Sequence, residues 1–181
     1  MAGSTKGSAV VTLPSETQIL ITREFDAPAS LVYRTFTEPA LIRRWWAGRQ
    51  GTVTSVDVDL RVGGHWRYVM EANGGFEVAF HGEYLEVVPN QRLVTTEVFE
   101  GAPEDDAPPP LCTYTFTAHD GRTTFTLLTR VADQATRDTI IGSGMETGMQ
   151  DGYDLAEQIA VELAIRSGVA QESGGSDPAL R

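Results

Sequence analysis

The chain has 181 residues, 41% of them hydrophobic and 22% charged, which are the proportions of one globular domain with a single sizeable core. Its formal net charge of −11 argues against binding to nucleic acids or anionic membranes, because both select basic proteins. The sequence has no long apolar run and no basic start followed by an apolar segment, so we expect neither a membrane-spanning helix nor a signal peptide.

The first quarter of the chain predicts an arm, a strand and two short helices. Residues 1–16 are rich in Gly, Ser, Thr and Ala, which is typical of a flexible arm, although residues 10–13 could pair locally. Apolar and polar residues alternate over 17–25, which is the period of a β-strand. Two short helices are expected at 28–37 and 38–46, each with a proline in its first turn, where the missing N–H costs nothing.

Six further strands are predicted between residues 52 and 131, separated by short breakers such as Asp120-Gly121. Strands joined this closely are antiparallel neighbours, because a parallel pair needs a long crossover. Residues 100–110 are the exception, an acidic loop with four prolines that is either a flexible insert or an entrance flap. The predicted strands are 52–60, 65–72, 76–88, 92–100, 111–118 and 123–131.

A long amphipathic helix is predicted near the end of the chain. From Met145 onwards, apolar or small residues recur every three or four positions and so lie on one helix face. Residues 142–144, Gly-Ser-Gly, are expected to kink or break the helix. Residues 168–181 are predicted to be a disordered tail. The domain therefore spans residues 17–167, and its element order is that of an α+β fold in which a seven-stranded antiparallel sheet curls around the long helix.

One face of this helix carries almost no side chain, because small residues recur on it every four positions. Glycine in a helix interior costs up to about 1 kcal/mol, so a compensating role is expected. The ridge either lets the helix pack closely on its neighbours or leaves space that is itself a cavity, and the sequence leaves both open. The ridge consists of Gly148, Gly152, Ala156 and Ala160.

Four segments in the expected order resemble the bacterial homologues of the activator of Hsp90 ATPase, within the START-like, or SRPBCC, superfamily. They read FDAPASLVYRTFTEPALIRRWW, VDVDLRVGGHWRYVM, FHGEYLEVVPNQRLVTTEVFE and SGMETGMQDGYDLAEQIA. The resemblance implies the helix-grip, or Bet v 1-like, fold, with an apolar cavity between the curved sheet and the C-terminal helix. The superfamily includes lipid carriers, hormone receptors, cyclases and co-chaperones, so the fold alone does not determine the function.

Aromatic residues on the predicted strand faces, together with the helix ridge, favour binding of a small hydrophobic or amphipathic ligand. Trp45 and Trp46 are adjacent and cannot face the same way, so we expect one to pack in the core and the other to close the cavity mouth. The predicted ligand contacts are Trp45, Trp66, Tyr68, Phe80, Tyr84, Tyr114, Phe116, Met145, Met149, Gly152 and Tyr153.

Two other functions remain open from the sequence. A polyketide cyclase- or hydrolase-like enzyme would need a buried polar pair, and His81 and Glu83 lie two apart on one predicted strand. The same pair is exposed on the convex face if Phe80 and Tyr84 point inward, and the pattern favours this second arrangement. A chaperone- or stress-linked module would instead bind a protein partner through the acidic loop or an exposed aromatic patch.

Several familiar sites are missing from the sequence. Three scattered histidines and one cysteine give no metal-ligand spacing, so no metal site is predicted. No dinucleotide fingerprint and no nucleophile elbow occurs, and we expect no cofactor. The single Cys112 excludes an internal disulfide and favours a reducing, cytoplasmic location. We expect the protein to be a monomer or a homodimer.

Overall fold

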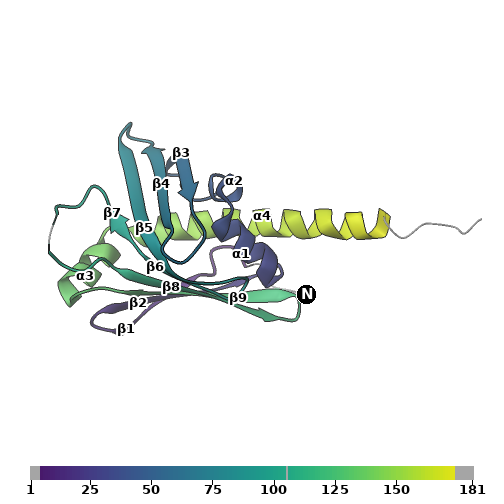
Figure 1. The fold of residues 1–181 in the computed structure, drawn as a ribbon, viewed down its shortest axis with the longest axis horizontal. Coiled ribbons are helices and arrows are strands. Elements are labelled where there is room, and N and C mark those ends of the chain that lie inside the picture. Colours follow the sequence, from purple (N-terminus) through teal and green to yellow (C-terminus); the bar gives the residue numbers. More distant parts are fainter. Residues whose placement is uncertain (1–4, 105, 174–181) are drawn as a thin grey trace, which may run out of the picture.

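The computed structural model describes residues 5–104 and 106–173, which form nine strands and four helices (Figure 1). Their order is β1 (Val10–Ser15), β2 (Gln18–Phe25), α1 (Ala29–Thr37), α2 (Pro39–Ile42), β3 (Gly51–Val58), β4 (His65–Ala72), β5 (Glu77–Val88), β6 (Arg92–Thr96), β7 (Val98–Phe99), β8 (Leu111–His119), β9 (Arg122–Arg130), α3 (Gln134–Gly142) and α4 (Met145–Ser173).

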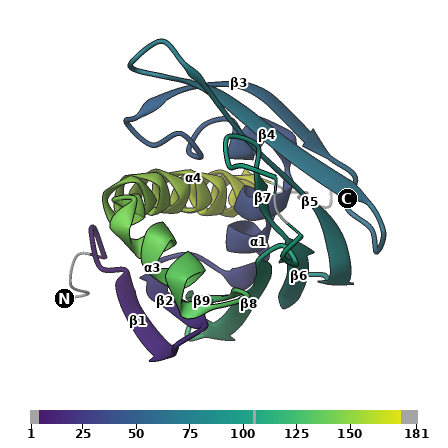
Figure 2. The same ribbon diagram turned by 90° about the vertical axis from the view of Figure 1, so that its left-hand side faces the viewer.

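The strands form one antiparallel sheet in the order β1-β2-β9-β8-β6-β5-β4-β3, with β7 paired to β5. Figure 2 shows α4 nearly end-on, with the sheet curving around it. Strong strand twist curls a sheet of this size, and the concave face then buries the apolar side of the helix. The predicted fold class, an α+β helix-grip architecture, is confirmed.

The strand count differs from the seven predicted, for two reasons. Residues 10–15 of the expected flexible arm form β1 and pair with β2 in the register Val11↔Ile21, so the local pairing allowed for residues 10–13 occurs and extends to Ser15. Val10, Val11 and Thr12 are β-branched and complete the free edge of β2. In addition, the strand predicted over 92–100 is interrupted at Glu97 and becomes β6 and β7.

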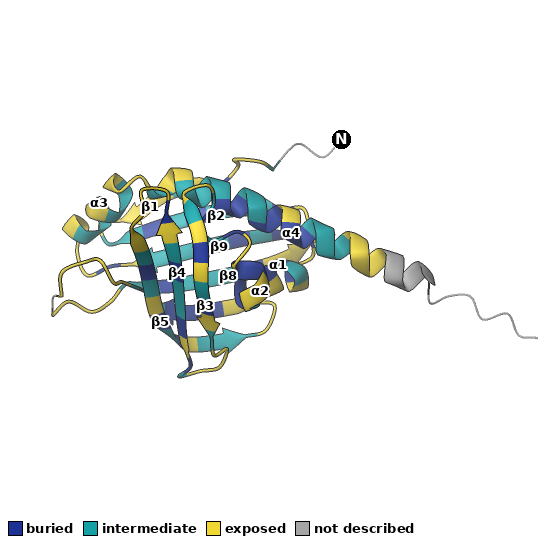
Figure 3. Ribbon diagram, turned by 90° about the horizontal axis from the view of Figure 1, so that it is seen from above, coloured by how far each residue is buried: buried dark blue, intermediate teal, exposed yellow. Residues whose placement is uncertain are grey.

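Two helix predictions are corrected as well. The second short helix is a helix only over 39–42, because residues 43–49 continue as turns. The tail predicted from residue 168 is wrong for 168–173, which continue α4, while 174–181 lie outside the described residues. Figure 3 shows buried residues where α4 crosses the sheet and exposed residues farther along the helix.

The small-residue ridge of α4 packs closely against the segment after α2. A Cβ atom on Gly152 would lie 3.3 Å from the Trp45 carbonyl oxygen and 3.5 Å from the Trp45 ring. One on Gly148 would lie 2.8 Å from the Gln50 amide. Ala156 is fully buried. The ridge therefore allows close approach of the segment after α2, which favours the packing alternative at these positions.

The predicted break between the two C-terminal helices is confirmed at Gly144, which has a φ of +78°. L-residues avoid this left-handed region because their Cβ meets the backbone, so glycine is suited to the junction. A Cβ on Gly144 would meet no atom within 4 Å, and neither would one on Gly142 at the end of α3.

Gly144→Ala is therefore expected to lower the free energy of unfolding by about 1–2 kcal/mol through its backbone conformation alone. The matched control is Gly142→Ala, which sits in equally open space without a positive φ and is expected to be neutral or slightly stabilising. Urea denaturation of the two variants and the wild type measures both effects. Equal stability of the two variants would contradict this account of the junction.

Candidate functional site

A cavity of about 2020 Å³ lies between the first half of α4 and the concave face of the sheet. Its walls come from β4, β5, β6, β8 and α4, and α3 borders it as well. Residues 102–104 and 106–110 of the acidic loop also line it. The loop therefore lies where an entrance flap would have to lie (Figure 1).

The structure brings together all but one of the predicted ligand contacts. Phe116 is the exception: it is 3% exposed and faces the core, where its ring lies 5.5 Å from those of Tyr33 and Phe125. The predicted residues that do line the cavity are Trp45, Trp66, Tyr68, Phe80, Tyr84, Tyr114, Met145, Met149, Gly152 and Tyr153.

The two adjacent tryptophans occupy different environments, although both border the cavity. Trp45 is 8% exposed, donates its ring N–H to the Thr35 carbonyl at 2.9 Å and lies 4.8 Å from the Phe36 ring. Trp46 is half-buried and packs edge-to-face on Tyr68 and Phe80, at 5.5 and 5.9 Å. Trp45 is thus the core residue and Trp46 the cavity residue, which the sequence did not assign.

Tyrosine hydroxyls are the main neutral polar groups in the cavity wall. Burial raises the pKa of Tyr84 to about 12, although its hydrogen bond with the Tyr68 hydroxyl opposes this shift. Burial also raises the pKa of Tyr68, Tyr114 and Tyr153 above the ordinary value. All four side chains are therefore neutral hydrogen-bonding groups near neutral pH.

Glu97 is the acidic side chain inside the cavity that the sequence analysis missed. It lies at the interruption between β6 and β7, and its backbone N–H donates to the Pro110 carbonyl at 3.0 Å. Burial raises the pKa of its carboxyl to about 7. The sequence did contain a signal for this position. Side chains alternate along a strand, so Leu93, Thr95 and Glu97 lie on one face, and this face lines the cavity.

The raised pKa of Glu97 predicts that the ligand-free protein becomes less stable as the pH rises from about 5 to 8. The folded carboxyl holds its proton up to about pH 7, whereas the unfolded one releases it near 4.5, so the folded state binds more protons in this interval. Glu97→Gln is expected to flatten this part of the profile in urea denaturation. Parallel profiles for variant and wild type would contradict the assignment.

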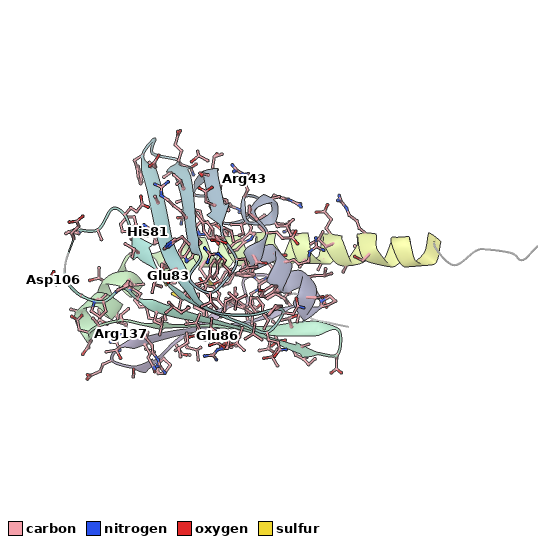
Figure 4. The ribbon with its side chains drawn as sticks, in the orientation of Figure 1. Arg43, His81, Glu83, Glu86, Asp106 and Arg137 are labelled. Carbon is pink, nitrogen blue, oxygen red and sulfur yellow. The ribbon has the colours of Figure 1, made fainter. Side chains whose placement is uncertain are left out.

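His81 and Glu83 do not form the buried pair that an enzyme would need, and His81 is exposed, which is the arrangement that the sequence pattern favoured. His81 Nδ1 lies 2.9 Å from Glu100 Oε1, and Arg67 contacts both carboxylate oxygens of Glu100 at 2.8 and 2.9 Å. The Arg67 and His81 hydrogen bonds lower the pKa of Glu100 to about 2. The His81 side chain is 46% exposed at the cavity rim, and Glu83 lies two residues along β5 (Figure 4). This arrangement is an exposed ion-pair network, not a buried acid–base pair.

Within the described residues, no group of three or more His, Cys, Asp or Glu side chains is arranged to hold a metal ion. No helix in the same part of the chain is both long and apolar enough to cross a bilayer.

Solved structures with the same fold come from several bacteria. A Rhodobacter sphaeroides protein is 24% identical, with a TM-score of 0.75 over 87% of this chain and 98% of its own. NE0264 of Nitrosomonas europaea is 24% identical, with a TM-score of 0.74 over 84% and 99%. Ms6760 of Mycobacterium smegmatis is 25% identical, with a TM-score of 0.72 over 83% and 96%. No curated protein matches the sequence significantly.

The comparison with protein families shows the family to which this chain belongs. The family described as "Activator of Hsp90 ATPase homolog 1-like protein" matches residues 26–160, from the end of β2 well into α4. The match covers most of the chain, including both short helices. It confirms the family resemblance that the sequence segments had indicated. The chain therefore belongs to the activator of Hsp90 ATPase homolog 1-like family.

Proposed function

We propose that this protein binds a small hydrophobic or amphipathic molecule in the cavity between α4 and the concave sheet. The observation that carries the proposal is the cavity itself, about 2020 Å³ in volume and lined by aromatic rings and methionines. Small-molecule sites occupy about 300–1,000 Å³ and are mostly apolar with a few polar groups. The cavity exceeds that range, so it can hold a ligand of this class together with water.

The exposure of the lining side chains supports a binding site and argues against a plain core. Tyr68, Tyr114 and Met149 point to the concave side of the fold yet are only half-buried. By contrast, Phe25 and Phe125, beneath α1, are fully buried. Burying apolar surface stabilises a protein by about 25 cal/mol per Å². The apolar surface of the cavity lacks this stabilisation in the ligand-free protein, and a bound ligand would provide it.

Filling the cavity with a side chain is the direct test. Met149→Trp is expected to weaken binding of the neutral probe N-phenyl-1-naphthylamine by about tenfold or more, measured by fluorescence titration. Val62→Trp is the matched control, because it adds the same side chain at a site that is 62% exposed and does not line the cavity. Equal affinities in both variants, or no binding by the wild type, would refute the proposal. Native mass spectrometry of protein purified from its own host would identify the ligand.

A protein-interaction function is a second candidate, because large apolar side chains are exposed at the rim. Phe76 and Phe99 are 61% and 44% exposed and both border the cavity. The description of the family points to Hsp90 as a partner to test. Titration of this protein with Hsp90 from its host, followed by calorimetry at several temperatures, tests this candidate. The absence of binding heat at every temperature would rule it out. The enzyme alternative is not proposed, because its His81–Glu83 pair is not formed.

A further inference from the structure

The charged groups that line the cavity are mostly acidic. Its described lining contains only two basic side chains, Arg49 and His81, both exposed at the rim, and His81 already contacts Glu100. The potential inside therefore favours a cation over an anion. The acidic side chains are Glu97, Glu100, Glu104, Asp106 and Asp133.

Glu97 is the member of this acidic group that lies inside the cavity. Burial raises the pKa of its carboxyl. The titratable groups close enough to interact with it come from β4, β8 and α4 and are all neutral near pH 7. They are Tyr68, Cys112, Tyr114 and Tyr153.

A second polar group lies two residues away on the same strand face. Thr95 is 3% exposed and lines the cavity, and its hydroxyl has no hydrogen-bond partner among the residues that the structure describes. A buried hydroxyl without a partner costs about 1–3 kcal/mol, so we expect a bound ligand to supply the missing hydrogen bond. Together Glu97 and Thr95 form an acidic polar end of the cavity, whose wall also carries the four tyrosine hydroxyls.

The acceptor oxygens of Glu97 and Thr95 match a head group that only donates hydrogen bonds. An ammonium group has three donors and no acceptor, and its charge would pair with the ionised Glu97 carboxylate. A carboxylate head group would instead place a second negative charge beside Glu97, or force the two to share a proton. The polar end therefore discriminates by charge between ligands of equal apolar length.

We infer that the ligand is a cationic amphiphile, an alkyl or aryl amine whose ammonium group is held by Glu97 and Thr95. This inference rests on the proposed binding function and adds the chemical class of the ligand. The apolar part of the amine lies against the aromatic wall of Trp46, Tyr68 and Phe80. Fatty-acid anions of the same length are expected to bind most weakly.

Competition among decylamine, decan-1-ol and decanoate against N-phenyl-1-naphthylamine tests this inference at pH 8. We expect wild type to bind decylamine at least about tenfold more tightly than decan-1-ol, and decanoate most weakly. Glu97→Gln is expected to remove the preference for the amine over decan-1-ol, and urea denaturation shows independently that the variant is folded. Glu104→Gln, at an exposed rim position, is the matched control and keeps the preference.

Wild type alone provides an independent measurement. Its affinity for decylamine is expected to rise from pH 6 to pH 8, as Glu97 ionises, while its affinity for decan-1-ol stays constant. Tight binding of decan-1-ol with no preference for the amine would overturn the inference and leave the proposed function intact. Failure of the neutral probe and of all three competitors would overturn both.

Discussion

Arg23→Met is expected to lower the free energy of unfolding by about 3–5 kcal/mol, the usual result of removing one partner from a buried ion pair. Arg23 is 1% exposed on β2, and its guanidinium lies 2.8 Å from Glu157 and 2.9 Å from Asp154 on α4. Methionine preserves most of the apolar stem but removes the charge that pairs with the buried Glu157 carboxylate. Urea denaturation at pH 7 measures the loss.

The matched control is Arg34→Met, which breaks an exposed pair with Glu38 and is expected to cost less than about 1 kcal/mol. A double variant, Arg23→Met with Glu157→Gln, removes the uncompensated charge and is expected to recover part of the loss. The backbone N–H of Asp26 also donates to Glu157 at 2.8 Å, so the pair links β2 to α4. Similar losses for Arg23→Met and Arg34→Met would show that the network contributes little.

The periodicity of the sequence was sufficient to predict the architecture. Alternation shows which face of a strand is apolar, and the three-to-four repeat shows the same for the long helix. It could not show which part of the concave face α1 covers. Phe116 has the same pattern as Tyr114, yet the ring of Phe36 on α1 lies 5.8 Å from the Phe116 ring and excludes it from the cavity. That distinction depends on tertiary packing, which no local pattern contains.

The role of the glycine ridge and the position of Glu97 in the cavity could not be predicted from the sequence, for related reasons. Whether the space beside Gly152 is empty depends on Trp45, about a hundred residues earlier, whose carbonyl oxygen lies 3.3 Å from the point that a Cβ atom on Gly152 would occupy. Glu97 resembled one more residue of an ordinary strand, because a charged side chain is normally exposed. The strand is interrupted at Glu97 because β6 pairs with β8, whereas β7 pairs with β5. Such pairing between distant segments cannot be read from the local sequence.

Trp45→Ala and Trp46→Ala are expected to separate stability from ligand binding at two adjacent positions. Trp45→Ala removes a ring that contacts Phe36 and lies 6.0 Å from Tyr153, and it leaves the Thr35 carbonyl without its donor. A loss of about 3–5 kcal/mol in the free energy of unfolding follows, because Trp45 is only 8% exposed and its packing against Phe36 and Tyr153 is lost. Urea denaturation measures this loss.

Trp46→Ala is expected to cost no more than about 1–3 kcal/mol, because its half-buried ring borders the cavity and little new space is enclosed. It removes the edge-to-face contacts with Tyr68 and Phe80, so affinity for N-phenyl-1-naphthylamine is expected to fall about tenfold. Comparable destabilisation by both substitutions, with probe affinity unchanged in Trp46→Ala, would place Trp46 in the core. Binding would then have to depend on the opposite wall, where Met145 and Met149 of α4 face the sheet.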